Sequence, residues 1–171
     1  WQAFARMGAA DVAGARLGEG HADAQAIVAE LAPAVGPPRG RLGVWAAEAP
    51  RGGVTATPDA DGWTLNGERA WCSGATSLDA ALVTAHAPDG LRLFLLPLGT
   101  AGLTVEPDTW PAVGMATTDS LTVRFDGVRL PAATEPGTIE LGGPGAYLDR
   151  PGFWHGAIGV AACWFGGAVG V

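Results

Sequence analysis

The feature that most constrains the fold is a series of short apolar runs between Leu42 and Leu130, each bounded by turn residues. Most runs are rich in β-branched and aromatic residues, and the separators include DADG, NG, PDG and GTAG. This pattern is typical of an antiparallel sandwich or barrel. In 120-SLTVRFDGVRL-130 apolar and polar residues alternate, and the phase slips after an Asp-Gly pair, which indicates a bulge or turn. We therefore expect a β domain with one buried face.

Helical patterns flank this β region. Apolar residues recur near helical spacing over residues 9–32, although glycines weaken the pattern, and Pro33 marks its end. Residues 152–171 carry no Asp, Glu, Lys or Arg, and this length is enough to span a bilayer. Six of these twenty residues are glycine, however, and only Arg150 lies nearby to mark an orientation. We expect instead a fully buried helix of a larger helical bundle, in which glycines four residues apart allow close helix approach.

Charge and cysteine usage exclude some functional classes. The formal net charge of −7 argues against a nucleic-acid surface and against binding to anionic membranes. Cys72 and Cys163 lie in apolar sequence, which favours a reducing cytoplasm over a disulfide framework. The chain begins at Trp1 rather than Met, so we expect a processed, cloned or incompletely represented form.

Motifs for metal or phosphate binding are weak. The three histidines are widely separated, and no Cys or His pair has the spacing of metal ligands. The segment 142-GGPG-145 lacks the Lys and Ser/Thr that a phosphate loop requires. Glu48 follows the apolar run 44-VWAA-47, where it is either a charge at a pocket mouth or a solvated loop residue.

The stretch 66-NGERAWCSGA-75 gives a positive signal. Its Asn-Gly pair predicts a tight hairpin, and the strand that follows runs into a glycine. Because residues i and i+2 of a strand share a face, Trp71 and Ser73 are expected to point to the same side. A flat aromatic wall beside a hydroxyl donor suits a flat ligand with polar edges, although ordinary core packing is the alternative.

Three segments together resemble the middle β domain of the acyl-CoA dehydrogenase family. They are 62-GWTLNGERAWCSGATSLDAALVTA-85, 91-LRLFLLPL-98 and 114-GMATTDSLTVRFDGVRLP-131. The family typically reads G-x-x-L-N-G-x-K-x-W-I-S/T, then an apolar strand, then G-M/L/W-x-x-S/T-x-S-x-x-V-x-F-x-x-V-x-V-P. The resemblance covers about residues 42–131.

This resemblance implies an α+β fold, with an antiparallel β-sandwich or barrel-like middle domain between helical segments. Residues 1–35 would be the end of an N-terminal helical domain, and residues 36–140 the middle β domain. Residues 141–171 would be a linker and the first helix of a C-terminal helical domain.

The resemblance also implies a cofactor and its contacts. The family removes hydrogen from the α and β carbons of an acyl thioester and passes a hydride to FAD. Trp71 matches the tryptophan that flanks the flavin, and Ser73 matches the residue whose hydroxyl and backbone N–H face the flavin N5. Ala46 and Ala47 lie in 44-VWAAEAP-50, which takes the place of the segment that holds the pyrimidine side of the flavin. The catalytic glutamate of the family lies farther into the C-terminal domain, so no catalytic residue is assigned here.

Three departures from the family pattern bear on the substrate. Ala47 stands where the family usually has Ser or Thr, and 51-RGGV-54 replaces the usual G-x-G-S-D. Arg69 replaces a lysine and keeps its charge, so we expect this change to be inconsequential.

The implied partners are an acyl-CoA or related acyl thioester, further copies of the chain in a homo-oligomer, and an electron-transfer flavoprotein. Two alternatives stay open: a flavin oxidase or monooxygenase on the same fold, and a non-catalytic β-barrel binding protein or partner subunit.

Overall fold

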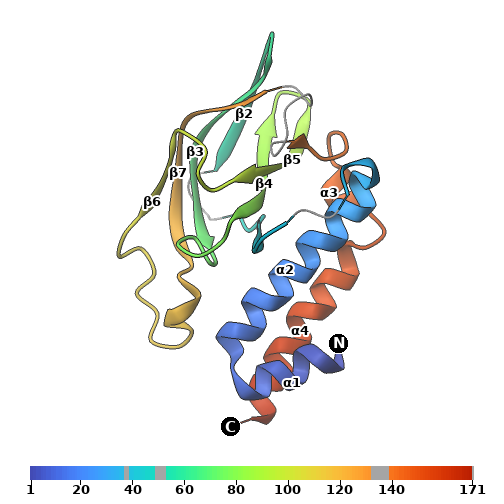
Figure 1. The fold of residues 1–171 in the computed structure, drawn as a ribbon, viewed down its shortest axis with the longest axis vertical. Helices are drawn as coiled ribbons and strands as arrows, with labels where there is room; N and C mark the ends of the chain where they lie inside the picture. The colour runs from blue at the N-terminus through green and yellow to red at the C-terminus, as the bar shows by residue number, and fades with distance from the viewer. Residues whose placement is uncertain (37–38, 49–52, 132–138, 171) are drawn as a thin grey trace.

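The computed structural model describes residues 1–36, 39–48, 53–131 and 139–170, and its long helices lie beside one end of a large sheet (Figure 1). The helical elements are α1 (Gln2–Ala10), α2 (Val12–Leu31), η1 (Pro33–Val35), η2 (Ala116–Thr118), α3 (Ala146–Asp149) and α4 (Phe153–Val169). The strands are β1 (Leu42–Trp45), β2 (Val54–Asp59), β3 (Gly62–Cys72), β4 (Ala80–Ala87), β5 (Gly90–Pro97), β6 (Leu103–Glu106), β7 (Leu121–Pro131) and β8 (Ile139–Glu140). This order confirms the predicted α+β class.

Two helices precede the sheet, and the second, α2, covers most of the helix predicted over residues 9–32. Asp11 separates them: its backbone is extended (φ −159°), and its Oδ1 accepts a 2.9 Å hydrogen bond from the Ala13 N–H. An aspartate in this position caps the first turn of the following helix, so α2 starts anew at this point. The helix then ends at Leu31, before Pro33, as predicted.

Glycines let α4 approach α1 closely. A Cβ at Gly166 would lie 2.0 Å from the Ala5 carbonyl oxygen, and a Cβ at Gly170 would lie 2.3 Å from that of Ala9. No side chain tolerates contacts this short, so the two backbones meet where α4 carries glycine. The close approach expected from glycines four residues apart is therefore present (Figure 1).

The strands form one sheet in the order β6-β7-β3-β2-β4-β5-β8, with β1 beside β4. Most neighbouring strands are antiparallel, as predicted, but β1 and β2 each pair with β4 in parallel. Among the described residues the end strands β6 and β8 do not pair, so the sheet is open and not a closed barrel. In the sequence β1 and β4 lie on either side of the β2–β3 hairpin, so local periodicity does not reveal their pairing.

Two apolar cores lie on opposite faces of β4 and β5. Leu82 and Leu95 pack in the core that α2 covers, whereas Val83, Phe94 and Leu96 lie in the core shared with β3 and β7. Because both faces of these strands are buried, they read in the sequence as continuous apolar runs and not as alternating ones. The core that contains Leu82 and Leu95 also joins α2 to the sheet.

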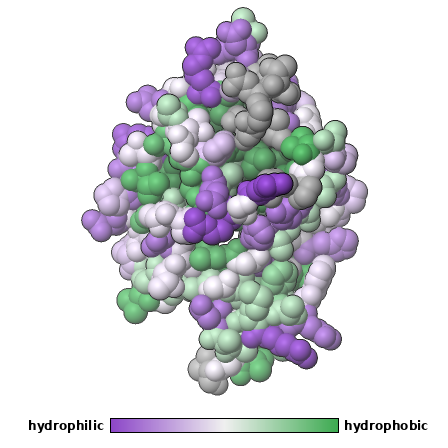
Figure 2. Space-filling view, in the orientation of Figure 1, coloured by the Kyte–Doolittle hydropathy of each residue, from purple (hydrophilic) through white to green (hydrophobic). Residues whose placement is uncertain are grey.

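The helix α4 is buried along one side only. It packs on α1 and α2 through Cys163 and Gly166, whereas Trp154, Trp164 and Phe165 are more than half exposed. The expectation of a fully buried helix therefore holds for one of its sides within this chain. In the described ranges, no helix combines the length and apolar character that a membrane span requires. Figure 2 shows hydrophobic side chains scattered over the visible face, with hydrophilic ones gathered at the tip of the β2–β3 hairpin.

Candidate functional site

A cavity of about 350 Å³ lies where the end of β1 meets α2 and the start of α4. Its walls are Val44, Ala46 and Ala47 at and after the end of β1, Arg16, Glu19, Gly20 and Asp23 on α2, and Tyr147, Leu148, Arg150, Phe153, Gly156, Ala157 and Val160 around α3 and α4. A volume of this size suits a small organic ligand. The predicted cofactor-binding residues Ala46 and Ala47 thus lie at the junction of sheet and helices.

Ser73 lies beside a second, smaller cavity of about 40 Å³. Arg16, Gly20 and Val44 line both cavities, so the two hollows share a wall. We call the combined hollow the β1–α2 groove; its defining residues are Arg16, Gly20, Val44, Ala46, Ala47 and Ser73.

Trp71 reaches the surface through an irregularity in β3. The pairing with β7 shifts between Arg69 and Cys72, and Trp71 takes a left-handed conformation (φ 62°). Its side chain is 48% exposed, whereas Cys72 is fully buried and Ser73 is half-buried. A left-handed bulky residue costs about 1–3 kcal/mol, and strain of this kind gathers at functional sites. Trp71 does not line either part of the groove, so its predicted contact with a flavin stays a prediction.

A buried indole fixes Ser73 against β1. Trp45, the last residue of β1, is 2% exposed, and its Nε1–H donates a 3.1 Å hydrogen bond to the Ser73 carbonyl oxygen. The Ser73 N–H donates to the Trp71 carbonyl oxygen at 3.0 Å. The backbone N–H that the resemblance directs toward a flavin therefore has a partner inside the chain.

Three hydroxyl groups form a chain behind Ser73. The Ser73 Oγ lies 2.8 Å from the Ser120 Oγ, which lies 2.8 Å from the Thr118 Oγ1. The Thr118 hydroxyl in turn donates to the Met115 carbonyl oxygen at 2.8 Å. Thr118 is fully buried and Ser120 is 5% exposed. Both residues stand at Ser/Thr positions of the family pattern, but no role was assigned to them, because nothing local indicates that Ser120 contacts a residue 47 positions away.

Arg69 anchors the segment after β1 from inside the sheet. The residue is 2% exposed; its Nη1 donates to the Ala47 carbonyl oxygen at 2.7 Å, and its Nη2 to that of Thr84 at 2.6 Å. Burial lowers the pKa of Arg69, and the nearby Glu48 carboxylate opposes this. The replacement of lysine at this position, expected to be inconsequential, therefore concerns a buried group that holds the predicted cofactor segment. The sequence could have indicated this burial, because Arg69 lies on the same inward-facing side of β3 as Leu65.

Glu48 does not lie free at the end of this segment. Its Oε1 is 2.7 Å from the His86 Nε2 on β4, and both side chains are about half exposed, at 53% and 54%. Of the two interpretations from sequence, the partly solvated residue fits better, and the pair links the segment to β4.

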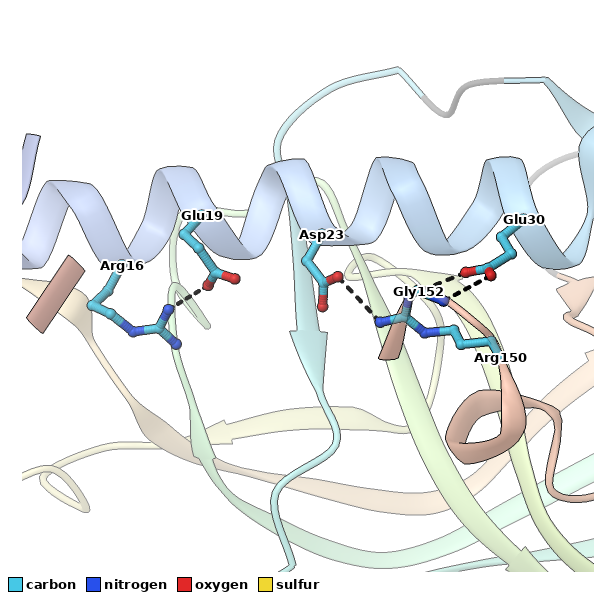
Figure 3. A network of polar contacts seen from close by, with 6 residues as sticks. All are labelled: Arg16, Glu19, Asp23, Glu30, Arg150 and Gly152. Carbon is cyan, nitrogen blue, oxygen red and sulfur yellow. Dashed lines mark hydrogen bonds and ion pairs between the residues drawn. The ribbon is translucent and has the colours of Figure 1, made fainter. Parts of the chain in front are cut away.

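A network of charged side chains crosses the helical wall of the large cavity (Figure 3). Arg150 contacts Asp23 and Glu30 on α2, each at 3.2 Å, and its side chain is 2% exposed. Glu30 also accepts a 2.9 Å hydrogen bond from the Gly152 N–H at the start of α4. The network therefore fastens the α3–α4 junction to α2.

Burial dominates the titration of the carboxyl groups in this wall. It raises the pKa of Glu19 although Arg16 acts against it, and it raises the pKa of Asp23 although Arg150 acts against it. Burial also raises the pKa of Tyr147. The wall therefore holds carboxyl groups that take up a proton at a higher pH than free side chains do.

A comparison with known proteins identifies the domain. Residues 47–128 match the family model described as "Acyl-CoA dehydrogenase, middle domain". The chain carries an acyl-CoA dehydrogenase middle domain. This confirms the resemblance drawn from the hairpin, the apolar strand and the block before and within β7.

Curated relatives of this middle domain include two kinds of enzyme. Dibenzothiophene monooxygenase from Rhodococcus qingshengii is 35% identical over 102 residues, which are 56% of this chain and 23% of that protein. Mitochondrial short-chain specific acyl-CoA dehydrogenase from Sus scrofa is 30% identical over 124 residues, which are 63% of this chain and 30% of that protein. The matched region thus spans less than a third of either relative.

A solved structure extends the likeness beyond the middle domain. FMN-bound TdsC from Paenibacillus sp. A11-2 aligns with a TM-score of 0.79 at 28% identity, covering 98% of this chain and 48% of that chain. TdsC with FMN and indole aligns with a TM-score of 0.70 at 31% identity, and the alignment covers 86% of this chain and 40% of that chain. The flanking helices therefore belong to the shared fold as well.

The β1–α2 groove lies at the border of the middle domain. Ala47 and Ser73 fall inside the matched region, whereas Ala46 and the helical walls fall outside it. The site is therefore built by the middle domain together with the helices, and the assignment of Ala46, Ala47, Trp71 and Ser73 to a cofactor stays a prediction.

Proposed function

We propose that this chain forms the flavin-binding part of a flavin-dependent oxidoreductase, and that its reaction is the oxygenation of an apolar, aromatic substrate. The observation that carries the proposal is the β1–α2 groove, which joins the Ala46–Ala47 segment and Ser73 in a chain that aligns over 98% of its length with FMN-bound TdsC. We assign residues 36–140 to the middle domain, and residues 1–35 and 141–171 to the helical parts beside it.

The backbone after β1 fits the polar edge of a flavin ring. Arg69 holds the Ala47 carbonyl oxygen toward the buried side of the sheet. In a trans peptide the following N–H points the opposite way, so the Glu48 N–H is directed to the exposed side. A cation bound to the carbonyl strengthens that N–H as a donor. Donors of this kind suit the ring oxygen and nitrogen acceptors on the pyrimidine side of a flavin.

Two departures from the family pattern favour oxygenation over thioester dehydrogenation. Ala47 cannot supply the usual side-chain hydroxyl, and 51-RGGV-54, of which residues 51 and 52 lie outside the described residues, lacks the G-S-D that normally touches CoA. The dibenzothiophene monooxygenases also match at higher identity than the short-chain acyl-CoA dehydrogenases.

The residues of the groove would bind and orient the reactants. A bound reduced flavin supplies two electrons to O₂, so that one oxygen atom is added to the substrate and the other leaves as water. Val44, Phe153 and Val160 give the large cavity an apolar surface for an aromatic substrate. Burial raises the pKa of Glu19, whose carboxyl group lies beside that surface and pairs with Arg16.

Flavin titration of the full chain tests the cofactor assignment. FMN and FAD are each added while flavin fluorescence is followed, because the TdsC structures contain FMN and the family resemblance implies FAD. Trp71→Ala should weaken flavin binding by about 3–10-fold, the value of one aromatic contact. Trp164→Ala is the matched control, since Trp164 is 51% exposed and lies on α4. Equal affinities for the two variants, or no binding by the wild-type protein, would exclude the assignment.

Dehydrogenation of an acyl thioester is the second candidate function, because a short-chain acyl-CoA dehydrogenase is among the relatives. Oxygen consumption with reduced FMN and dibenzothiophene or indole measures the first activity, and dye reduction with a panel of acyl-CoAs measures the second. The proposal of oxygenation fails if only the dye is reduced. Flavin binding without either activity would favour a non-catalytic partner subunit.

A further inference from the structure

The segment after β1 follows β4 without belonging to a strand. β1 ends at Trp45, which lies opposite Val83 on β4 in a parallel pair. Continuing this register by three residues, from 45 to 48 and from 83 to 86, places Glu48 opposite His86. The side chains meet as the register requires, because the Glu48 Oε1 lies 2.7 Å from the His86 Nε2. Residues 46–48 therefore run beside β4 although the strand stops before them.

Within the described part of the chain, two side chains tie this segment to the sheet in place of a strand ladder. Arg69 bridges the two edges from inside, because it donates to the Ala47 carbonyl oxygen at 2.7 Å and to that of Thr84 at 2.6 Å. His86 holds the Glu48 carboxylate from outside, where both side chains are about half exposed. The segment thus has one buried anchor and one anchor in contact with solvent.

The two anchors respond differently to pH. A guanidinium keeps its charge, so the contacts of Arg69 do not change over the usual pH range. An imidazole loses its charge between about pH 5 and 8, and its contact with a carboxylate then changes from an ion pair to a weaker hydrogen bond. The Glu48 carboxylate also acts on Arg69, whose pKa it raises against the effect of burial. The outer anchor, His86, is therefore the one that titrates.

The other elements packed around His86 place no second charge in contact with it, as far as the described residues show. Its neighbours in the sheet are Thr55 on β2 and Leu91 on β5, and neither side chain titrates in this range. The charges at the β4–β5 turn, Asp89 and Arg92, contact each other. The charge of His86 consequently acts on its carboxylate partner and on the segment that carries it.

We propose that His86 is a positioning residue for flavin binding, because it holds the Ala46–Ala47 segment through Glu48 and holds it more firmly when protonated. This rests on the proposed function, since it requires a flavin ring on that segment. At low pH the ion pair fixes the Glu48 N–H where the ring edge is expected. At high pH the segment gains freedom, and ordering it again reduces the affinity. The fold thereby makes cofactor affinity depend on pH.

Flavin titration of the full chain at about pH 5.5 and about pH 8.5 tests this dependence. The measured quantity is the Kd at the higher pH divided by the Kd at the lower pH, for FMN and for FAD. This ratio should be about 2–5-fold larger in wild type than in His86→Gln, the range of one exposed ion pair. Glutamine keeps a donor for Glu48 but has no titrating ring. The phosphates of the ligand titrate equally for both proteins, so the comparison removes their effect.

Three further variants control the comparison. Glu48→Gln removes the carboxylate and should lower the ratio as His86→Gln does, and the double variant should lower it no further. His155→Gln removes another exposed imidazole, on α4, and should keep the wild-type ratio. Equal ratios in wild type and His86→Gln, an equal fall in His155→Gln, or a further fall in the double variant would overturn the positioning role.

The Glu48 amide resonance of the flavin-free chain tests the anchor without a ligand. In proton–nitrogen NMR spectra over the same pH range, this resonance should move in wild type and in His155→Gln and stay still in His86→Gln. A resonance that stays still in wild type, or that moves equally in His86→Gln, overturns the anchor. If the resonance behaves as expected but neither FMN nor FAD binds, the proposed function fails and the anchor stands, so the two failures are distinguishable.

Discussion

Replacing Arg150 with methionine should destabilise the helical wall of the cavity. The Arg150 side chain is 2% exposed and contacts Asp23 and Glu30, whose side chains are 17% and 27% exposed. Removing the guanidinium leaves two carboxylates without their partner, which typically costs 3–5 kcal/mol when the pair is buried. Because both carboxylates retain some contact with water, we expect a loss at the lower end, about 3 kcal/mol in the free energy of unfolding.

The matched control removes the same side chain from an exposed pair. Arg129 is 69% exposed and lies 3.6 Å from Asp59 and 3.8 Å from Asp61. Exposed pairs contribute about 0–1 kcal/mol, so Arg129→Met should change stability by no more than this. Urea unfolding followed by tryptophan fluorescence gives both values. Equal losses in the two variants would refute the assignment of Arg150 as a structural anchor.

The loss in Arg150→Met should also depend on pH. Burial already raises the pKa of Asp23 above 3.8, and Arg150 opposes this, so removing Arg150 raises the pKa further. A carboxyl group whose pKa is raised on folding favours the folded state at low pH, and that contribution is lost as pH rises through the folded pKa. The difference between wild type and Arg150→Met should therefore be smaller at about pH 5 than at about pH 7.5. A difference that grows as pH falls would contradict this reasoning.

Burial raises the pKa of Cys72 to about 12, so a thiol reagent at about pH 8 should label it only after unfolding, as mass spectrometry of labelled peptides can show. Gly166→Ala should lower the free energy of unfolding by at least about 2 kcal/mol, because the new Cβ would overlap the Ala5 carbonyl oxygen. In Gly20→Ala on α2 the new Cβ meets open space, so this variant should be more stable by about 0.5–1 kcal/mol. Rapid labelling of Cys72 in the native protein would contradict the first expectation. Equal effects of the two glycine variants on urea unfolding would contradict the other two.

The sequence predicted the β domain well because turn residues separate its strands and the strand positions that face the core are apolar. The helix predicted over residues 9–32 is present as α2 but begins after the cap at Asp11, which the weak pattern of alanine and glycine did not locate. The parallel pairing of β1 with β4 left no local signal, because it depends on contacts between distant segments.

The site was predicted only in outline. The hairpin located Trp71 and Ser73, but the exposure of Trp71 comes from a shift in strand pairing and not from the regular pleat. The change from lysine to Arg69 was expected to be inconsequential, yet the Arg69 side chain is buried in the sheet and donates to the Ala47 carbonyl oxygen. Ser120 lies between η2 and β7, far from Ser73 in the sequence, so their contact required three-dimensional information.

The parallel pairing of β1 with β4 also bears on how the chain folds. The contacts that close the groove join residues far apart in sequence: Trp45 with Ser73, Ser73 with Ser120, and Asp23 with Arg150, at separations of 28, 47 and 127 residues. Hairpins such as β4–β5 close short loops and can form early, whereas contacts of long separation form slowly. The groove is therefore completed late, and binding of its ligand during refolding should report the final step of folding and not the formation of the sheet.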